Sequence, residues 1–296
     1  MEQNKLQKAN SIKIVGRLVD AQVTTDRRQS DGQAYVSVVA TIQSQINGET
    51  NEYEVLFYSL EKTLEGKVSQ LYTSYSKMGE LVNKKVEVTG SLRENRYWSS
   101  NSNQIVSAQQ LSGRFIKGVV ESTQDEATFI ISGFLVTRLT EKRNKNDEVY
   151  RYDLSVGQAN YKGDNMDKFV LHVDPNNREA ISFLDSCEIG STFQFNGVLN
   201  FLVQKVTRTD DNAGGFGESV TRTYTNRQKN FWVKGSTAPI VEEEKGAYPE
   251  AVIKQLIAAY KAKDVELADK GSKGNDQPSD NSINNKPVTK RQASLI

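Results

Sequence analysis

Residues 12–19 read IKIVGRLV, and a related stretch returns at residues 131–135 as ISGFL. At a shift of 117 positions, two apolar residues and the glycine between them fall on residues of the same kind: Ile14, Gly16 and Leu18 on Ile131, Gly133 and Leu135. A repeat at a fixed shift is the primary clue to architecture, because each copy must then form one structural unit. The chain of 296 residues therefore reads as two copies of one small domain.

Further anchors support the repeat. Tyr35 falls on Tyr152 at the same shift, and the FIKG sequence at 115–118 falls on WVKG at 232–235. Gly90 begins a turn that matches the one at Gly197, at a shift of only 107. Loops of different length on one scaffold produce such offsets.

Apolar residues alternate with polar ones within each copy, as expected for strands with one face in a core. The inward set of the first copy is Ile12, Ile14, Leu18, Val36, Val38, Ala40, Ile42, Val55, Phe57, Val86, Val88 and Leu92. One helical stretch interrupts the strands of each copy, at 67–78 and at 177–184. Three strands, a helix and two strands is the order of an OB-fold.

We therefore predict a mostly β protein with two tandem OB-fold, five-stranded Greek-key barrels, at residues 10–120 and 127–238. Another small barrel or sandwich of similar strand count is the alternative that periodicity leaves open. Residues 247–264 predict an amphipathic C-terminal helix, which either packs on the second barrel or docks a partner. Residues 270–296 are polar and predict a disordered tail.

Composition narrows the function. The sequence has 38 Lys and Arg against 37 Asp and Glu, so any anion-binding surface must be a local patch. Cys187 is the single cysteine, and the polar N-terminal residues indicate no signal peptide or membrane span. His172 is the single histidine, and the glycine run at 214–217 lacks the residues of a phosphate-binding loop. We expect no catalytic residues, no metal, no cofactor and a cytoplasmic location.

Three stretches of the first copy resemble the bacterial and phage single-stranded DNA-binding protein family. Residues 12–19 look like its first strand, YEVLFY at 53–58 like its aromatic third strand, and LVNKKVEVTGSLR at 81–93 like its fourth-strand motif. The resemblance implies an OB-fold that coats and protects single-stranded DNA in replication or recombination, in the cytoplasm of a bacterial host if phage-encoded. This chain departs from the family in carrying two copies, which implies a monomer or homodimer, and in its non-acidic tail.

Binding of single strands without sequence preference requires aromatic faces for stacking and cations for phosphates. In the first copy, candidates come from the loop between the fourth and fifth strands, the loop between the first and second, and the surface of strands one to three: Arg17, Arg27, Arg28, Tyr35, Tyr53, Tyr58, Arg93, Arg96, Tyr97 and Trp98. In the second copy, a basic and aromatic loop and a glycine-containing loop at 205–222 offer Arg138, Lys142, Arg143, Lys145, Tyr150, Arg151, Arg208 and Phe216. For each residue, packing or a solvated turn is the alternative.

The leading hypothesis is a single-stranded DNA-binding protein with little sequence preference. Replication or recombination proteins could dock on the C-terminal helix or tail. A structural or protein-interaction role, as a virion component or assembly adaptor, is the alternative, since fold does not fix function. RNA binding differs from DNA binding mainly in the use of the 2′-hydroxyl, which the sequence does not reveal.

Overall fold

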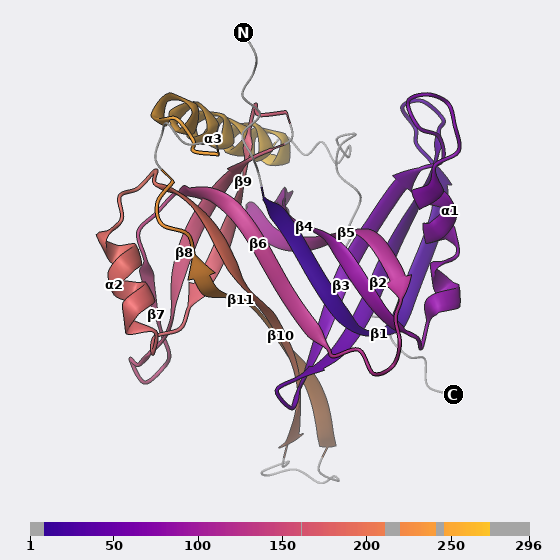
Figure 1. Cartoon of the computed structure of the whole chain (residues 1–296), viewed down its shortest axis with the longest axis horizontal. Helices are drawn as coiled ribbons and strands as arrows, with labels where there is room; N and C mark the ends of the chain where they lie inside the picture. The colour runs from indigo at the N-terminus through magenta and orange to yellow at the C-terminus, as the bar shows by residue number, and fades with distance from the viewer. Residues whose placement is uncertain (1–8, 161, 211–219, 241–245, 273–296) are drawn as a thin grey trace.

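The computed structural model describes residues 9–160, 162–210, 220–240 and 246–272, arranged around one extensive β-sheet (Figure 1). The first half contains β1 (Asn10–Arg27), β2 (Ala34–Ile46), β3 (Glu49–Leu60), α1 (Gln70–Ser76), a 3-10 turn (Met78–Leu81), β4 (Lys85–Ser99) and β5 (Gln104–Gly118). The second half contains β6 (Glu126–Leu135), β7 (Thr140–Arg143), β8 (Val149–Ala159), β9 (Met166–Val173), α2 (Arg178–Ser186), β10 (Thr192–Asp210) and β11 (Val220–Ser236). Helix α3 (Glu250–Ser272) follows.

Each half closes into a barrel with the strand order of an OB-fold. In the first, β1 pairs with both β2 and β4, and a parallel contact between β3 and β5 closes the ring. In the second, β6 pairs with β8 and β10, and a parallel contact between β9 and β11 closes it. We call these barrel one (β1–β5 with α1) and barrel two (β6–β11 with α2). The predicted mostly β fold class with OB-fold barrels is confirmed.

Local sequence explains how the elements begin and turn. Asn47 and Gly48 both have positive φ, as a tight hairpin between β2 and β3 requires. Ser69 caps α1 by accepting a hydrogen bond from the Tyr72 amide, and Asn177 caps α2 in the same way from Ala180. The twelve inward residues predicted for the first copy are all at most 2% exposed, so the period-two pattern identified the core correctly.

The strand pairings test the repeat directly. Ile12 pairs with Gly90, and their counterparts Phe129 and Gly197 also pair, which confirms the shifts of 117 and 107. Both glycines lie at β-bulges where a Cβ would come within 2.0 Å of the Ser112 carbonyl oxygen and 2.2 Å of the Trp232 oxygen, respectively. Only glycine allows so close an approach of two backbones.

Two of the other anchors are wrong. Leu18 pairs with Ile42, and its counterpart Leu135 pairs with Val156, so β2 matches β8 at a shift of 114. Tyr35 is therefore not equivalent to Tyr152. The last strands show the same kind of error. Gly90 pairs with Gly113, and Gly197 pairs with Val233, so β5 matches β11 at a shift of 120. The FIKG sequence is therefore not equivalent to WVKG. Loop-length differences had brought similar residues into false alignment.

The two barrels meet along β1 and β6 with approximate twofold symmetry. Ile12 pairs with Phe129, its own counterpart. On either side, Asn10 pairs with Ile131 and Ile14 pairs with Ala127, so each residue faces the counterpart of the other. In a symmetric dimer, each subunit contributes the same surface patch to the interface. Here the two barrels of one chain contact each other in that way.

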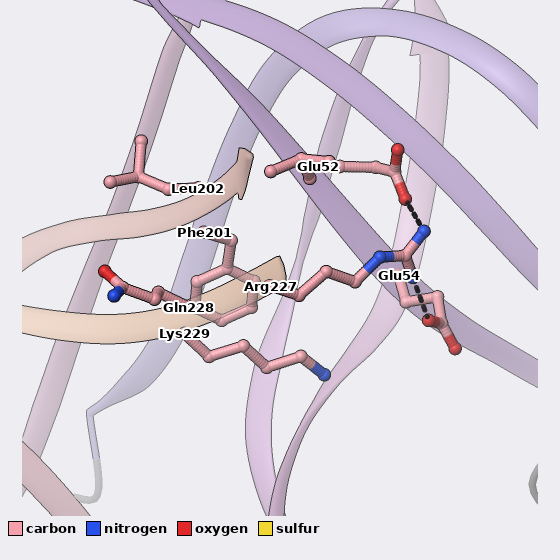
Figure 2. Close-up of a pocket in the computed structure, with 8 residues that line it drawn as sticks. Glu52, Glu54, Phe201, Leu202, Arg227, Gln228 and Lys229 are labelled. Carbon is pink, nitrogen blue, oxygen red and sulfur yellow. Dashed lines mark hydrogen bonds and ion pairs between the residues drawn. The ribbon is translucent and has the colours of Figure 1, made fainter. Parts of the chain in front are cut away.

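Each barrel also extends its last hairpin onto the third strand of the other. From barrel one, the Glu94 and Gln109 side chains accept hydrogen bonds from the Lys168 and Val170 amides of β9, at 2.8 and 3.0 Å. From barrel two, the Leu199 carbonyl accepts a hydrogen bond from the Tyr53 hydroxyl at 2.9 Å. Figure 2 shows the outer side of this second contact, where Arg227 on β11 bridges Glu52 and Glu54 on β3.

The C-terminal part differs from expectation in two places. Helix α3 continues to Ser272, past the predicted end at 264 and into the stretch from 270 that was expected to be disordered. Residues 273–296 lie outside the described residues. The loop predicted at 205–222 is largely strand, because β10 runs to Asp210 and β11 begins at Val220. No helix in the described part is long and apolar enough to cross a membrane.

Candidate nucleic-acid interface

An open cleft of about 370 Å³ lies on the outer surface of barrel one, between α1 and strands β3, β5 and β4. Its lining has two tyrosines, two arginines, three small polar side chains, three leucines and a glycine: Leu56, Tyr58, Leu71, Tyr75, Ser91, Arg93, Gln110, Leu111, Ser112, Gly113 and Arg114. We call it the barrel-one cleft. Concave sites with a few polar groups on an apolar base are typical of ligand binding.

Strand register gathers these groups on one face. Leu56 lies opposite Ser112 across the parallel β3–β5 contact, and Arg93 lies opposite Gln110 across β4 and β5. Because side chains alternate along a strand, Tyr58 and Arg114, two residues further on, share the same face. The buried Tyr75 of α1 donates a hydrogen bond to the Arg114 carbonyl at 2.6 Å, which fixes the helix against β5.

The two arginines of the cleft are available to a ligand. Both are exposed, and in the part of the chain that the structure describes neither forms an ion pair with a carboxylate. The Arg114 guanidinium lies 5.3 Å from the Phe115 ring centroid, on the exposed side of β5. Tyr58 is 37% exposed, so its ring is accessible. Of these groups, the sequence had indicated Tyr58 and Arg93.

Tyr35 extends the aromatic surface. Its ring centroid lies 5.5 Å from that of Tyr58, on the neighbouring strand. Beyond this pair, Arg28 forms an ion pair with Asp31 in the β1–β2 loop, and Arg27 donates to the Gly32 carbonyl at 3.1 Å. The Arg28 guanidinium lowers the pKa of Asp31 to about 2. These loop arginines are exposed or half-buried, but their local bonds reduce their freedom to follow a phosphate chain.

Arg17 lies apart from this surface. Its guanidinium pairs with Glu121 at 2.6 Å and also bonds the Asn83 carbonyl, so it braces the connection between the barrels.

The prediction that Arg96 and Trp98 face a ligand is wrong for this conformation, because α3 covers both. The Arg96 side chain is only 6% exposed, with its guanidinium 3.5 Å from the Tyr260 ring centroid and 3.0 Å from Asp264. A Cβ on Gly271 would lie 2.2 Å from the Trp98 ring, so the helix backbone rests against the indole. Tyr97, which points the other way along the strand, is 42% exposed.

Tyr53 is a second correction. It is fully buried, and its ring packs 5.3 Å from Phe201 of barrel two. Burial raises the pKa of the Tyr53 hydroxyl to about 12. Tyr53 therefore belongs to the contact between the barrels and offers no face to a base.

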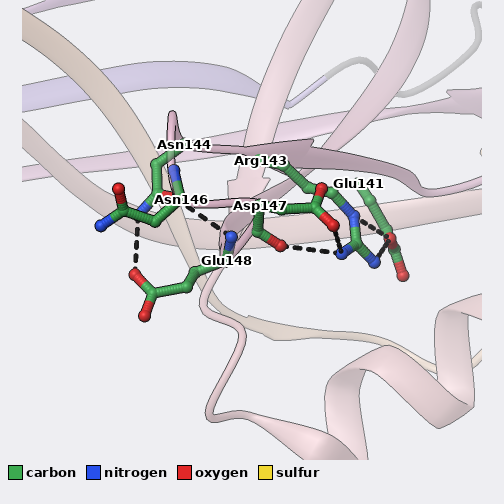
Figure 3. A network of polar contacts seen from close by, with 6 residues as sticks. All are labelled: Glu141, Arg143, Asn144, Asn146, Asp147 and Glu148. Atoms are coloured by element: carbon green, nitrogen blue, oxygen red, sulfur yellow. Dashed lines mark hydrogen bonds and ion pairs between the residues drawn. The ribbon is translucent and has the colours of Figure 1, made fainter.

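The basic loop of barrel two is largely neutralised by its own carboxylates. Figure 3 shows Arg143 held between Glu141 at 2.6 Å and Asp147 at 3.6 Å, in a turn braced by Asn144. On β7 and β8, Lys142 and Arg151 both pair with Asp153, at 3.8 and 2.8 Å. The remaining predicted side chains of this loop, Arg138, Lys145 and Tyr150, are exposed.

Two further candidates are not placed. Arg208 belongs to β10, but its side chain is outside the described part of the structure, and Phe216 lies outside the described residues altogether.

The face of barrel two that corresponds to the barrel-one cleft has different chemistry. The parallel pair Leu56–Ser112 corresponds to His172–Trp232, whose ring centroids are 5.7 Å apart. Counting along the same strands, Asp174 takes the place of Tyr58. From the Gly90 and Gly197 bulges, Asn200 takes the place of Arg93. In barrel two, two rings lie where barrel one has a leucine and a serine, and the positions of Tyr58 and Arg93 carry no aromatic ring and no cation, whereas Lys234 takes the place of Arg114.

Residues that sequence reasoning missed are Gln110, Ser112 and Arg114. They lie on β5, in the stretch QQLSGRF, where a bulge interrupts the period-two pattern. An arginine in the otherwise uncharged stretch from 104 to 116 was the available signal.

Two buried titratable groups occur on barrel two. Burial, followed by the nearby Glu94 carboxylate, raises the pKa of Asp167 to about 6, although Arg93 and other cations oppose the shift. Burial and the Arg151 charge lower the pKa of His172 to about 4, against the opposing effect of Asp153. The His172 Nδ1 atom accepts a hydrogen bond from the Phe231 amide at 3.2 Å, which is a structural role for a neutral ring. The described residues contain no cluster of side chains suited to a metal ion.

Comparison with solved structures gives the fold independent support. The wild-type single-stranded DNA-binding protein from Thermus aquaticus superposes with a TM-score of 0.51 at 13% identity, covering 82% of this chain and 99% of that chain. A deletion mutant of the same protein gives 0.50 at 13%, covering 82% and 98%. At this identity the likeness concerns the fold alone.

Comparison of sequences adds one family. A search of curated proteins found no match. The YorF family model, in contrast, matches residues 8–273 and so includes both barrels and α3. The chain therefore belongs to the YorF family.

Proposed function

We propose that this protein binds single-stranded DNA through barrel one, without sequence preference and without catalysing a reaction. One observation carries the proposal: the barrel-one cleft combines an accessible aromatic ring, Tyr58, with two exposed arginines, Arg93 and Arg114, that form no direct ion pair among the described residues. Stacking on an aromatic ring contributes about 1–3 kcal/mol per base and is tolerant of sequence. Arginines near it supply the contacts to phosphates.

We also propose a role in replication or recombination. Coating of transient single strands during replication or recombination, in a bacterial or phage-infected cytoplasm, agrees with the OB-fold and with the sequence resemblance. Helix α3 packs on barrel two through Ile253, Leu256 and Tyr260, so a protein partner would use its outward face or the tail. The molecule acts as a monomer or a homodimer, because two barrels in one chain replace part of an oligomer.

The test is fluorescence anisotropy of a labelled oligo(dT) at several salt concentrations. The wild type should bind at low salt and weaken as salt rises, because bound cations displace counterions from phosphates. Tyr58→Ala should weaken binding by roughly tenfold, within the range for loss of one stacked base. Lys254→Ala, on an exposed residue of α3, is the matched control and should bind as the wild type does. Equal binding by wild type and Tyr58→Ala would contradict the proposed site.

A protein-docking role is the second candidate. The observation in its favour is the internal pairing of Arg143, Lys142 and Arg151, which balances three of the cations on β7 and β8 of barrel two with nearby carboxylates. Absence of a shift with oligo(dT), oligo(rU) and duplex DNA at low salt would support that role. Preference for oligo(rU) over oligo(dT) would instead indicate RNA.

A further inference from the structure

The barrel-one cleft contains a small residue at a position where barrel two has a large one. Ser112 lies on β5 where Trp232 lies on β11, and its cross-strand neighbour is Leu56, where barrel two has His172. In barrel two the indole and imidazole rings are in edge contact and occupy the corresponding space. In barrel one, the serine leaves an opening bounded by Tyr58 on β3 and Arg93 on β4.

We propose that the barrel-one cleft accepts one unstacked nucleobase, which lies over Ser112 and against the Tyr58 ring. This inference rests on the proposed function and specifies its ligand as a base that is not paired. Arg93 on β4 and Arg114 on β5 also line the cleft and would contact the phosphates on either side of that base.

The lining suits a base better than it suits a phosphate or a sugar. The floor is formed by Leu56, Leu71 and Leu111, which can cover an aromatic face. Gln110 and Ser91 add groups that both donate and accept hydrogen bonds, so the edge of any base can be satisfied. A volume of about 370 Å³ falls at the lower end for small-ligand pockets, which suits one base.

The cleft is also closed from below. Gly113 lies over the Phe57 ring, where a Cβ would come within 2.2 Å of that ring, and Tyr75 of α1 closes the side by bonding the Arg114 carbonyl on β5. A base that enters must leave its neighbours in the strand, which a base in a duplex does only at the cost of unpairing. The cleft therefore favours single strands over duplexes.

The experiment transfers the arrangement of barrel two onto barrel one. The Ser112→Trp variant is compared with the wild type and with Trp232→Ser as the reciprocal control. Each protein is titrated with an oligo(dT) and with an abasic oligonucleotide of the same length, with anisotropy as the readout. The abasic strand keeps the phosphates and lacks the bases.

We expect the wild type to bind oligo(dT) roughly 5- to 150-fold more tightly than the abasic strand. This ratio corresponds to the free energy of about 1–3 kcal/mol that one stacked base contributes. Ser112→Trp should lose most of that ratio and keep its affinity for the abasic strand, while Trp232→Ser should resemble the wild type. Circular dichroism checks folding. If Ser112→Trp does not fold, Tyr58→Leu, at a residue 37% exposed, should show the same loss of ratio.

The outcomes separate the two proposals. Binding of both strands by the wild type with equal affinity, or an unchanged ratio in folded Ser112→Trp, would overturn the base pocket while leaving phosphate-directed binding intact. Failure of the wild type to bind either strand at low salt would instead overturn the proposed function itself.

Discussion

Barrel one and barrel two share a fold and a bulge glycine but differ in chemistry at three corresponding outward positions. Where barrel one has Tyr58, Arg93 and Ser112, barrel two has Asp174, Asn200 and Trp232. The positions that close the barrel are the same in both, whereas the outward positions of the third, fourth and fifth strands differ. The comparison shows that the same fold tolerates different side chains on its outer face, as expected when function depends on local sites.

The shared part of the scaffold should be the most sensitive to substitution. Gly90→Val and Gly197→Val should each destabilise the protein by about 3 kcal/mol or more, because the new Cβ meets a backbone carbonyl that cannot move aside. Urea unfolding midpoints measure the loss. A large effect in one barrel and none in the other would contradict the equivalence of the two bulges. Gly118→Ala, with open space around it, is the control.

Between about pH 4 and 7, the two barrels should differ because barrel two carries an Asp and a His with strongly shifted pKa values. Asp167 and His172 correspond to Asn51 and Leu56 of barrel one, which do not titrate. The pKa of Asp167 is raised from 3.8 to about 6, so its contribution to stability is present below about pH 4 and is lost as pH rises through 6. Asp167→Asn should therefore be more stable than the wild type at pH 7, by about 2 kcal/mol.

His172 should act in the opposite direction. Its pKa is lowered from 6.5 to about 4, so its contribution is present above pH 6.5 and lost as pH falls through 4. Urea titrations between pH 4 and 7 should show a steeper rise of stability with pH in Asp167→Asn than in the wild type. Asp174→Asn, at an exposed carboxylate, is the control and should leave the profile unchanged.

Charge removal should distinguish a free arginine from a paired one. Arg93→Ala should weaken oligo(dT) binding by roughly tenfold and lower the salt slope by about 1, as expected for one lost phosphate contact. Arg143→Ala removes a cation that Glu141 and Asp147 already balance, and should change affinity by less than about twofold. If the two variants lose affinity equally, the strand must cross both barrels.

The smallest effect is expected at Tyr150. This ring is 47% exposed on β8, with the Arg151 guanidinium 5.4 Å from its centroid. Because Arg151 is bound to Asp153, a stacked base would gain little help from charge there. Tyr150→Ala should bind oligo(dT) within about twofold of the wild type, and a tenfold loss would assign a second binding face to barrel two.

The sequence predicted the barrels because their cores follow strand periodicity, and every inward residue named for the first copy is buried. Contacts between side chains that are far apart in the sequence could not be predicted from it. Nothing local in RENRYW shows that Tyr260 and Gly271, more than 160 residues later, cover Arg96 and Trp98. Similarly, the match of Tyr35 with Tyr152 failed because a three-residue difference reverses which face a strand residue takes.

The cleft itself was only partly foreseeable. Tyr58 and Arg93 were recognised as residue types suited to nucleic acid. Ser112 has no such chemistry, and its importance lies in being smaller than Trp232 at a corresponding place. Recognising this size difference requires the correct alignment of β5 with β11. The bulges in these strands change that alignment, so the sequence alone did not reveal it.

The seam between β1 and β6 has a consequence for any attempt to divide the protein. Cutting the chain in the connection at 119–125 would release two fragments, each with a strand whose backbone donors and acceptors had lost their partners between Asn10 and Val15 or between Glu126 and Ile131. Such an edge invites pairing with another strand, and because the seam is self-complementary, a second copy of the same fragment is a suitable partner. Covalent linkage thus fixes the ratio of barrel one to barrel two at one to one. The separated halves could instead pair with copies of themselves, which would give dimers with two barrel-one clefts or with none.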